Sequence, residues 1–249
     1  MDKPSAYPEL STYDLCAESI YNNTKLTGKP GLTYTYNSVH LQLAGAMALA
    51  ATGETDIQKI VSKYLFEPYE MTSTTCAEPT ATIPQLAICL ETVGNDYANF
   101  LDATFNHKVL PADLVAESEK DYTEFEKGYT LYGHYGFGHF LECYDSVAGQ
   151  TPECTAAQIH ADPGALGYYP LIDRTKGYYM QIVANEGGKF YPRSGIPEYL
   201  RFATKPLVDA VMAGEAGNSA SFGHHTPSKC RQPLVLPGVR GCAYAVIVV

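Results

Sequence analysis

The sequence of residues 31–75 reads GLTYTYNSVHLQLAGAMALAATGETDIQKIVSKYLFEPYEMTSTT and carries the strongest fold signal in the chain. Apolar side chains recur at helical spacing over residues 39–50, which predicts a helix. Asn37 and Ser38 stand before this run and can cap its first turn. Gly53 follows the run and provides a stop, because glycine accepts the left-handed backbone that ends many helices.

A second helix is predicted directly after Gly53. Thr55 stands three residues before Gln58, which is the spacing of a capping box. An apolar stripe over residues 57–64 follows. Pro68 ends this helix, because proline lacks the N–H that a helical hydrogen bond requires.

This pair of helices resembles a motif of the serine beta-lactamase-like family, which takes in class C beta-lactamases, penicillin-binding-protein-type peptidases and related esterases. In that family an aromatic-x-Tyr-x-Asn loop enters a helix that ends in Thr-Gly, and a second helix runs into Phe-x-Pro-Leu-Gly-Met-x-x-Thr. The positions that match without a gap are Tyr34, Tyr36, Gly45, Thr52, Gly53, Phe66, Pro68, Met71 and Thr74. The chain departs from the pattern at Ser38, where the family usually has Asn, and at Tyr69 and Glu70, which replace Leu-Gly.

Other stretches also resemble the family. Residues 96–101 match an Asp-Tyr-x-x-Phe-Leu helix, and residues 135–138 match a Tyr-Gly-x-Gly strand. Residues 160–173 resemble the third active-site strand and its neighbour, where the family has Lys-Thr-Gly or His-x-Gly. Depending on a one-residue shift, the Lys or His position falls on His160 or on Ala161.

The resemblance implies a candidate site for acyl transfer. Tyr36 takes the place of the Tyr that serves as acid and base, Ser38 that of the polar residue that contacts substrate, and His160 is the third candidate. Ser38 can equally be a helix cap alone. The family's nucleophile lies in Ser-x-x-Lys, but no serine of this chain is followed three residues later by lysine. Because only about one phenol in a thousand is ionised at neutral pH, the residues present do not make a working site by themselves.

The expected fold is α/β of the α+β type, beta-lactamase/transpeptidase-like, with an antiparallel sheet flanked by helices and a helical region over about residues 15–114. Residues 160–173 and 178–183 should form a hairpin around a turn at 174–177. A last helix is expected from Pro197. Its predicted inward face is Leu200, Ala203, Leu207 and Val211. By comparison with the family, the fold should be incomplete.

Two parts are expected in the chain. Residues 1–213 should form a partial beta-lactamase-like domain, and residues 214–249 a C-terminal tail rich in Gly, Ser and Pro. Residues 243–249 form an unbroken apolar run and are the candidate for an added edge strand. A partner chain, a homodimer or this tail would cover the surface of an incomplete core.

Composition excludes several classes of protein. The chain of 249 residues is 45% hydrophobic and 18% charged, which is ordinary for a globular protein. A net charge of −10 argues against nucleic-acid binding, which requires clustered Lys and Arg. No apolar run approaches the roughly 20 residues of a membrane helix, and the N-terminus shows no apolar signal region.

Seven cysteines without any Cys-x-x-Cys spacing favour disulfides over a zinc site. Proximity in sequence suggests the pairs Cys76 with Cys89, Cys143 with Cys154 and Cys230 with Cys242, which leaves Cys16 alone. Together with the N-glycosylation pattern at Asn22, these pairs predict an extracellular or secretory location. The alternative, buried thiols in a cytosolic protein and a chance pattern, stays open.

No metal or cofactor is expected. His134 and His139 flank the Tyr-Gly-x-Gly stretch. Two histidines five positions apart on one strand would point to opposite faces of a sheet and would not converge on an ion.

Two functional hypotheses follow. The first is a serine beta-lactamase-related hydrolase acting on an ester, amide or peptide, of which this sequence is a C-terminal portion without its nucleophile motif. Unpaired Cys16 supports it if the partner thiol lies elsewhere. The second is a non-catalytic binding or structural protein on the same scaffold. An internal bond to Cys16 would favour the second.

Overall fold

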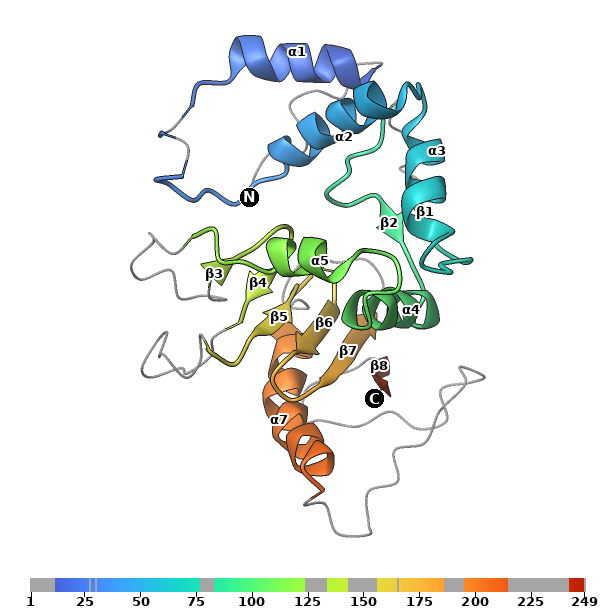
Figure 1. The fold of residues 1–249 in the computed structure, drawn as a ribbon, viewed down its shortest axis with the longest axis vertical. Helices are drawn as coiled ribbons and strands as arrows, with labels where there is room; N and C mark the ends of the chain where they lie inside the picture. The colour runs from blue at the N-terminus through green and yellow to red at the C-terminus, as the bar shows by residue number, and fades with distance from the viewer. Residues whose placement is uncertain are drawn as a thin grey trace. The chain divides into compact units, whose positions relative to one another are not determined.

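The computed structural model describes residues 12–26, 28–29, 31–76, 83–123, 134–142, 156–164, 166–185, 195–214 and 242–248 (Figure 1). The chain divides into two compact units, Met1–Phe100 and Leu101–Val249. Within the described residues, no helix is both long and apolar enough to cross a bilayer. The expected boundary between residues 213 and 214 stays a prediction, because residues 215–241 lie outside the described part of the chain.

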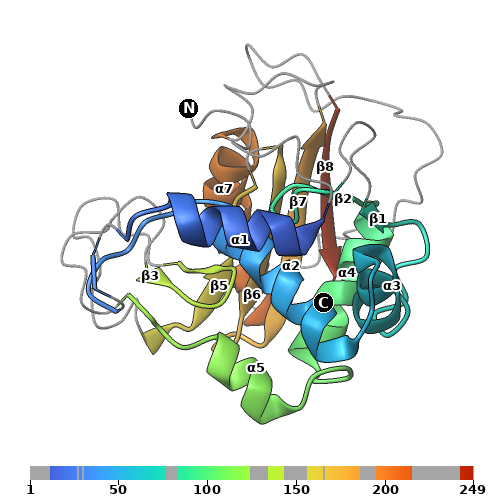
Figure 2. The same cartoon turned by 90° about the horizontal axis from the view of Figure 1, so that it is seen from above.

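The first unit is mainly helical (Figure 2). Its elements are α1 Tyr13–Asn23, α2 Val39–Thr52, α3 Ile57–Val61, the π-helical turn η1 Ser62–Phe66, β1 Thr75–Cys76, β2 Leu90–Glu91 and the start of α4 Gly94–Phe105. The helix predicted over residues 39–50 is α2, and Gly53 ends it in the left-handed conformation with a φ of 70°. The predicted capping box is wrong, because Asp56, not Thr55, accepts the hydrogen bond from the backbone N–H of Gln58, at 2.9 Å.

The core of this unit forms where α1, α2 and α3 meet. Tyr13, Ala46, Ile57 and Ile60 are buried together. Gly45 lets α1 approach α2 closely, since a Cβ at this position would lie 2.9 Å from the ring of Tyr13. Gly45, one of the positions that match the motif, therefore has a packing role.

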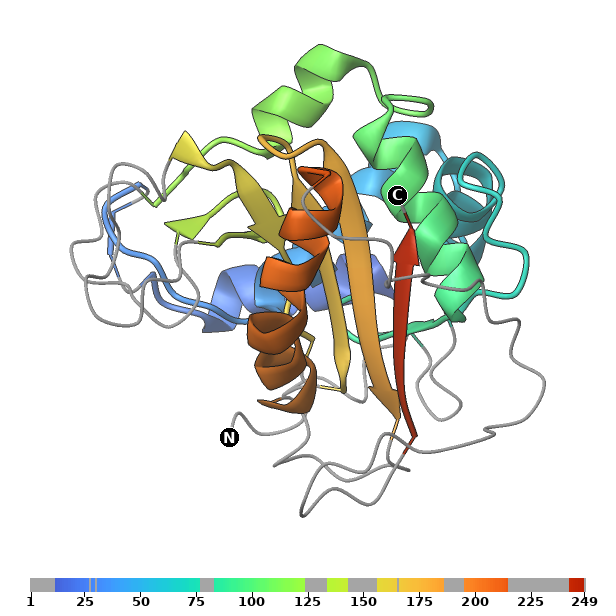
Figure 3. The same ribbon diagram turned by 90° about the horizontal axis from the view of Figure 1, so that it is seen from below.

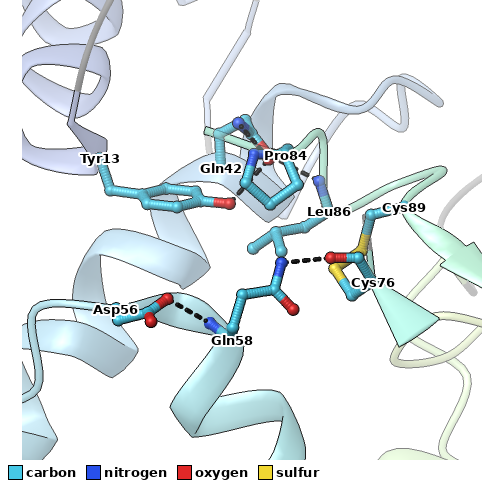
Figure 4. Close-up of a disulfide and its surroundings, with 8 residues drawn as sticks. All are labelled: Tyr13, Gln42, Asp56, Gln58, Cys76, Pro84, Leu86 and Cys89. Carbon is cyan, nitrogen blue, oxygen red and sulfur yellow. Dashed lines mark hydrogen bonds between the residues drawn. A yellow bond between two sulfur atoms is a disulfide. The ribbon is translucent and has the colours of Figure 1, made fainter. Parts of the chain in front are cut away.

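The predicted disulfide Cys76–Cys89 is present and links β1 to β2, which pair antiparallel (Figure 4). The side-chain amide of Gln58 donates to the carbonyl oxygen of Cys76, and this bond connects α3 to the disulfide. The proposed partners Cys143, Cys154 and Cys230 lie outside the described residues.

We expect the Cys76→Ala/Cys89→Ala double variant to lose about 3 kcal/mol of unfolding free energy, because the bond closes a loop with a sequence separation of 13. Urea denaturation measures this loss, and peptide mapping of the unreduced wild type checks the pairing. A peptide that links Cys89 to any cysteine other than Cys76 would contradict it.

The second unit is built on a six-stranded antiparallel sheet in the order β3-β4-β5-β6-β7-β8 (Figure 3). The strands are β3 His134–Tyr135, β4 Phe140–Leu141, β5 Ile159–Ala161, β6 Tyr168–Asp173, β7 Tyr178–Asn185 and β8 Cys242–Val248. The predicted hairpin is β6 and β7, with a turn that ends at Gly177. Its first arm begins at Tyr168 and not at residue 160, because residues 159–161 form the separate strand β5. The apolar run at the C-terminus is strand β8, which pairs with β7 at one end of the sheet, as predicted.

Helix α7, Gly195–Met212, covers one face of the sheet (Figure 3). The buried core between them is Ala161, Tyr169, Leu171, Tyr178, Met180, Ile182 and Val208. The predicted inward face of this helix is only partly correct: Leu200 packs against the core, but Leu207 is 59% exposed. Arg201 and Lys205 are buried instead, where they form ion pairs with Glu142 and Asp173. The structure is therefore a mixed α and β fold with an antiparallel sheet, as the sequence predicted.

Candidate active site

Tyr36 lies in the loop that enters α2, and the residue is 62% exposed. The loop is fixed at its junction with the helix, because the carboxamide oxygen of Asn37 accepts a 2.9 Å hydrogen bond from the backbone N–H of Val39. A capped helix start places the backbone of Tyr36 next to a rigid element. The phenol is therefore on the surface of the first unit and is not a packed core aromatic.

Ser38 is the residue immediately before α2, but its side chain makes no capping hydrogen bond. Asn37 provides the cap in its place. Of the two interpretations of Ser38 that the sequence left open, capping by its hydroxyl is therefore excluded. Contact with a substrate stays a prediction.

Helix α2 is held in the first unit by polar contacts with residues 84–86 (Figure 4). The side chain of Gln42 accepts from the backbone N–H of Leu86 at 2.9 Å and donates to the carbonyl oxygen of Pro84 at 3.3 Å. The hydroxyl of Tyr13 donates to the same carbonyl at 2.7 Å. These bonds fix the helix that follows the Tyr36 loop.

His160 lies in β5 of the second unit and is only 7% exposed. Its Nε2 is 3.6 Å from Oε2 of Glu119, and its ring packs edge-on against His139, with 5.1 Å between ring centroids. In the described part of the chain, neither Nδ1 of His160 nor Nε2 of His139 has a hydrogen-bond partner. The two histidines therefore form a buried polar pair.

Arg174 binds Glu119, the carboxylate beside His160. Its Nη2 donates to Oε1 of Glu119 at 2.7 Å and its Nε to the same oxygen at 3.1 Å. Its Nη1 donates to the carbonyl oxygen of Phe105 at 2.7 Å, which ties the β6–β7 turn to the end of α4. The negative charge of Glu119 favours a protonated histidine, and the positive charge of Arg174 opposes it.

Burial is the largest cause of the pKa shifts of His160 and its neighbours. It lowers the pKa of His160 to about 4, against the raising effect of Glu119. Burial also lowers the pKa of His139. Nearby, in the loop after β5, burial raises the pKa of Asp162 to about 6. At neutral pH His160 is therefore an uncharged imidazole.

The prediction that His134 and His139 lie on one strand is wrong. β3 and β4 are the two arms of a hairpin, with His134 in β3 and His139 in the turn before β4. Nδ1 of His134 contacts the carboxylate of Asp121, whereas His139 packs against His160. Among the residues that the structure describes, no group of three or more His, Cys, Asp and Glu side chains is arranged to hold a metal ion.

Comparison with known proteins identifies the fold but not a close relative. The structure is similar to that of a beta-lactamase from Mycobacterium bovis, with a TM-score of 0.55 and 16% sequence identity, over 83% of this chain and 77% of that chain. The fold is beta-lactamase-like. A penicillin-binding protein homologue from Pyrococcus abyssi, described as octameric, gives a TM-score of 0.45 and 15% identity, over 80% of this chain and 48% of that chain. No protein-family model and no curated protein matches the sequence.

Within this beta-lactamase-like fold, the predicted site residues occupy separate units. Tyr36 and Ser38 share one loop of the first unit, and His160 belongs to the sheet of the second. The sequence did not indicate Glu119, Arg174 or His139 as neighbours of His160. Arg174 and Glu119 are 55 positions apart, so no local spacing could have found this contact.

Proposed function

We propose that this chain is the C-terminal portion of a serine beta-lactamase-related hydrolase that transfers the acyl group of a small-molecule ester, amide or peptide. The observation that carries the proposal is the exposed phenol of Tyr36, in a loop fixed to a capped helix, in a chain with a beta-lactamase-like fold. The sequence match around Tyr36 is free of gaps. Ser38, with a hydroxyl that is not used for capping, is the proposed substrate contact.

Acyl transfer requires more than Tyr36. A nucleophile must attack the carbonyl carbon, and a base must accept its proton. The 249 residues contain no Ser-x-x-Lys. We propose that this motif comes from a segment outside these residues or from a partner chain.

Tyr36 also requires a cation beside it, because a phenolate is scarce at neutral pH without one. His160, the third proposed site residue, does not meet this need while its pKa is about 4. Its proposed role is hydrogen bonding by a neutral ring. The cation is expected to be the lysine of the supplied Ser-x-x-Lys.

We expect Tyr36→Phe to lower kcat/KM by about 10²–10⁴-fold in a form of the protein that contains the nucleophile, since a general acid or base contributes roughly this much. Tyr64→Phe is the matched control, because Tyr64 is another exposed tyrosine of the same unit and should leave kcat/KM unchanged. Steady-state hydrolysis of an activated ester measures both. Full activity in Tyr36→Phe would overturn the role of Tyr36.

A non-catalytic binding or structural protein is the second candidate. The burial of His160 and the neutral state of its ring favour it, because a reactive group must reach substrate. Cys16 no longer separates the two candidates. Its thiol is free and buried, and burial raises its pKa, so its lack of a bond does not require a missing partner. Absence of hydrolysis in every form that contains Ser-x-x-Lys would support this candidate.

The disulfide Cys76–Cys89 is compatible with an extracellular location. We propose that the protein acts outside the cell or in the secretory pathway. A partner chain or a second copy that covers an incomplete core is part of the same proposal.

A further inference from the structure

The sequence Asn22-Asn23-Thr24 is not used by the proposed hydrolase site. It is the one Asn-x-Ser/Thr stretch among the 249 residues. It lies at the end of α1, where the helix finishes at Asn23 and Thr24 adopts an extended backbone with φ −103° and ψ 124°. The acceptor is therefore at a junction between a helix and an extended chain.

Asn22 points away from the core of the first unit. The buried side chains of α1 are Tyr13, Cys16 and Ile20. At 100° per residue, Asn22 lies about 150° around the helix from the centre of this face, and it is exposed. A large group attached to Asn22 would meet solvent.

The adjacent Asn23 is held differently. Its carboxamide nitrogen donates to the carbonyl oxygen of Ser19 at 2.9 Å and to the hydroxyl of Ser19 at 3.2 Å. Asn23 also lacks a hydroxyl residue two positions later, because Lys25 stands there. The two neighbouring asparagines therefore form a natural test and control.

Two large apolar residues lie close to Asn22 in the sequence. Tyr21 and Leu26 are each 86% exposed. A bulky, hydrated group on the intervening asparagine would shield them from association with other chains. The disulfide Cys76–Cys89 lies in the same unit, and disulfides form in the compartments in which asparagine is glycosylated.

We infer that Asn22 carries an N-linked glycan. The donor is an oligosaccharide on a polyprenyl diphosphate carrier. Nδ2 of Asn22 forms a bond to the anomeric carbon of the first sugar, the bond from that carbon to the diphosphate breaks, and the diphosphate leaves with the electron pair. The transferase takes the proton from the amide nitrogen. This inference is independent of the hydrolase proposal.

The test is intact-mass and peptide mass spectrometry of the whole chain from the cells that make it, before and after digestion with peptide N-glycosidase. We expect one glycan, with conversion of Asn22 to aspartate when it is removed. The same chain, secreted from a eukaryotic host, provides the variants. Asn22→Gln and Thr24→Ala should lose the glycan, whereas Asn23→Gln and Thr24→Ser should keep it.

Thr24→Ala preserves the backbone bond from residue 24 to Ile20, so it separates loss of the glycan from loss of the fold. Unmodified Asn22 in the native protein would overturn the inference. Retention of the glycan in Asn22→Gln, or its loss in Asn23→Gln, would overturn the assignment to Asn22.

Discussion

Between neutral pH and about pH 4, the wild type is expected to lose about 3 kcal/mol of unfolding free energy because of His160. The His160→Gln variant should not show this loss. The folded pKa of His160 is about 4, whereas an unfolded histidine titrates near 6.5. As the pH falls below about 6.5, His160 becomes protonated in the unfolded chain but stays neutral in the folded chain. The free energy of unfolding therefore decreases until the pH reaches about 4. At one pKa unit per 1.36 kcal/mol, this gap gives roughly 3 kcal/mol.

The measurement is the difference in unfolding free energy between His160→Gln and the wild type at pH 7 and pH 4. Comparison with the wild type separates this effect from that of Asp162, whose pKa is raised to about 6 and which acts in the opposite direction. His139 packs against His160 and its pKa is also lowered by burial, so the difference reports the histidine pair. A raised acid pKa stabilises the fold as the pH falls from about 6 to 3.9. His40→Gln is the control, since His40 is exposed. A His160→Gln difference that stays constant between the two pH values would contradict the burial of His160.

Replacing Lys205 is expected to lower the free energy of unfolding by about 3–5 kcal/mol, because the buried carboxylate of Asp173 is left without an opposite charge. Nζ of Lys205 lies 2.8 Å from Oδ2 of Asp173, and the two side chains are 8% and 1% exposed. The same ammonium donates to Asp209 at 3.0 Å. Lys205→Met retains most of the apolar stem but removes the charge, so the loss measures the uncompensated carboxylate of Asp173.

Lys176→Met is the matched control. Its ammonium is 2.8 Å from Oδ2 of Asp209, but its side chain is 46% exposed, so its removal should cost no more than about 1 kcal/mol. Guanidinium denaturation followed by circular dichroism compares the two variants. The double variant Lys205→Met/Asp173→Asn should recover part of the loss, because neither buried charge remains. Equal costs for Lys205→Met and Lys176→Met would contradict the buried pair.

Local signals predicted the helices and the hairpin well. The stop at Gly53 and the turn before Tyr178 depend on residues next to one another, and the apolar run at the C-terminus has the length of β8. The helix cap at Asp56 was missed because Thr55 and Asp56 are adjacent and both are residue types that cap helices.

Contacts between distant residues could not be predicted. The inward face of α7 was partly misassigned because apolar spacing does not reveal that Arg201 and Lys205 have buried carboxylate partners, Glu142 just after β4 and Asp173 in β6. The His139–His160 pair likewise depends on how β4 and β5 align. The role of Tyr36 stays a prediction, because a sequence motif alone marks its loop.

Covalent labelling with a serine-reactive fluorophosphonate tests the central claim most directly, because it reports the presence of an activated serine. Intact-mass spectrometry would be applied to the 249-residue chain alone and to a longer gene product or complex that contains Ser-x-x-Lys. We predict no adduct on the chain alone and one adduct, on the serine of that motif, in the longer form. An adduct on the chain alone, or none on the longer form, would contradict the account.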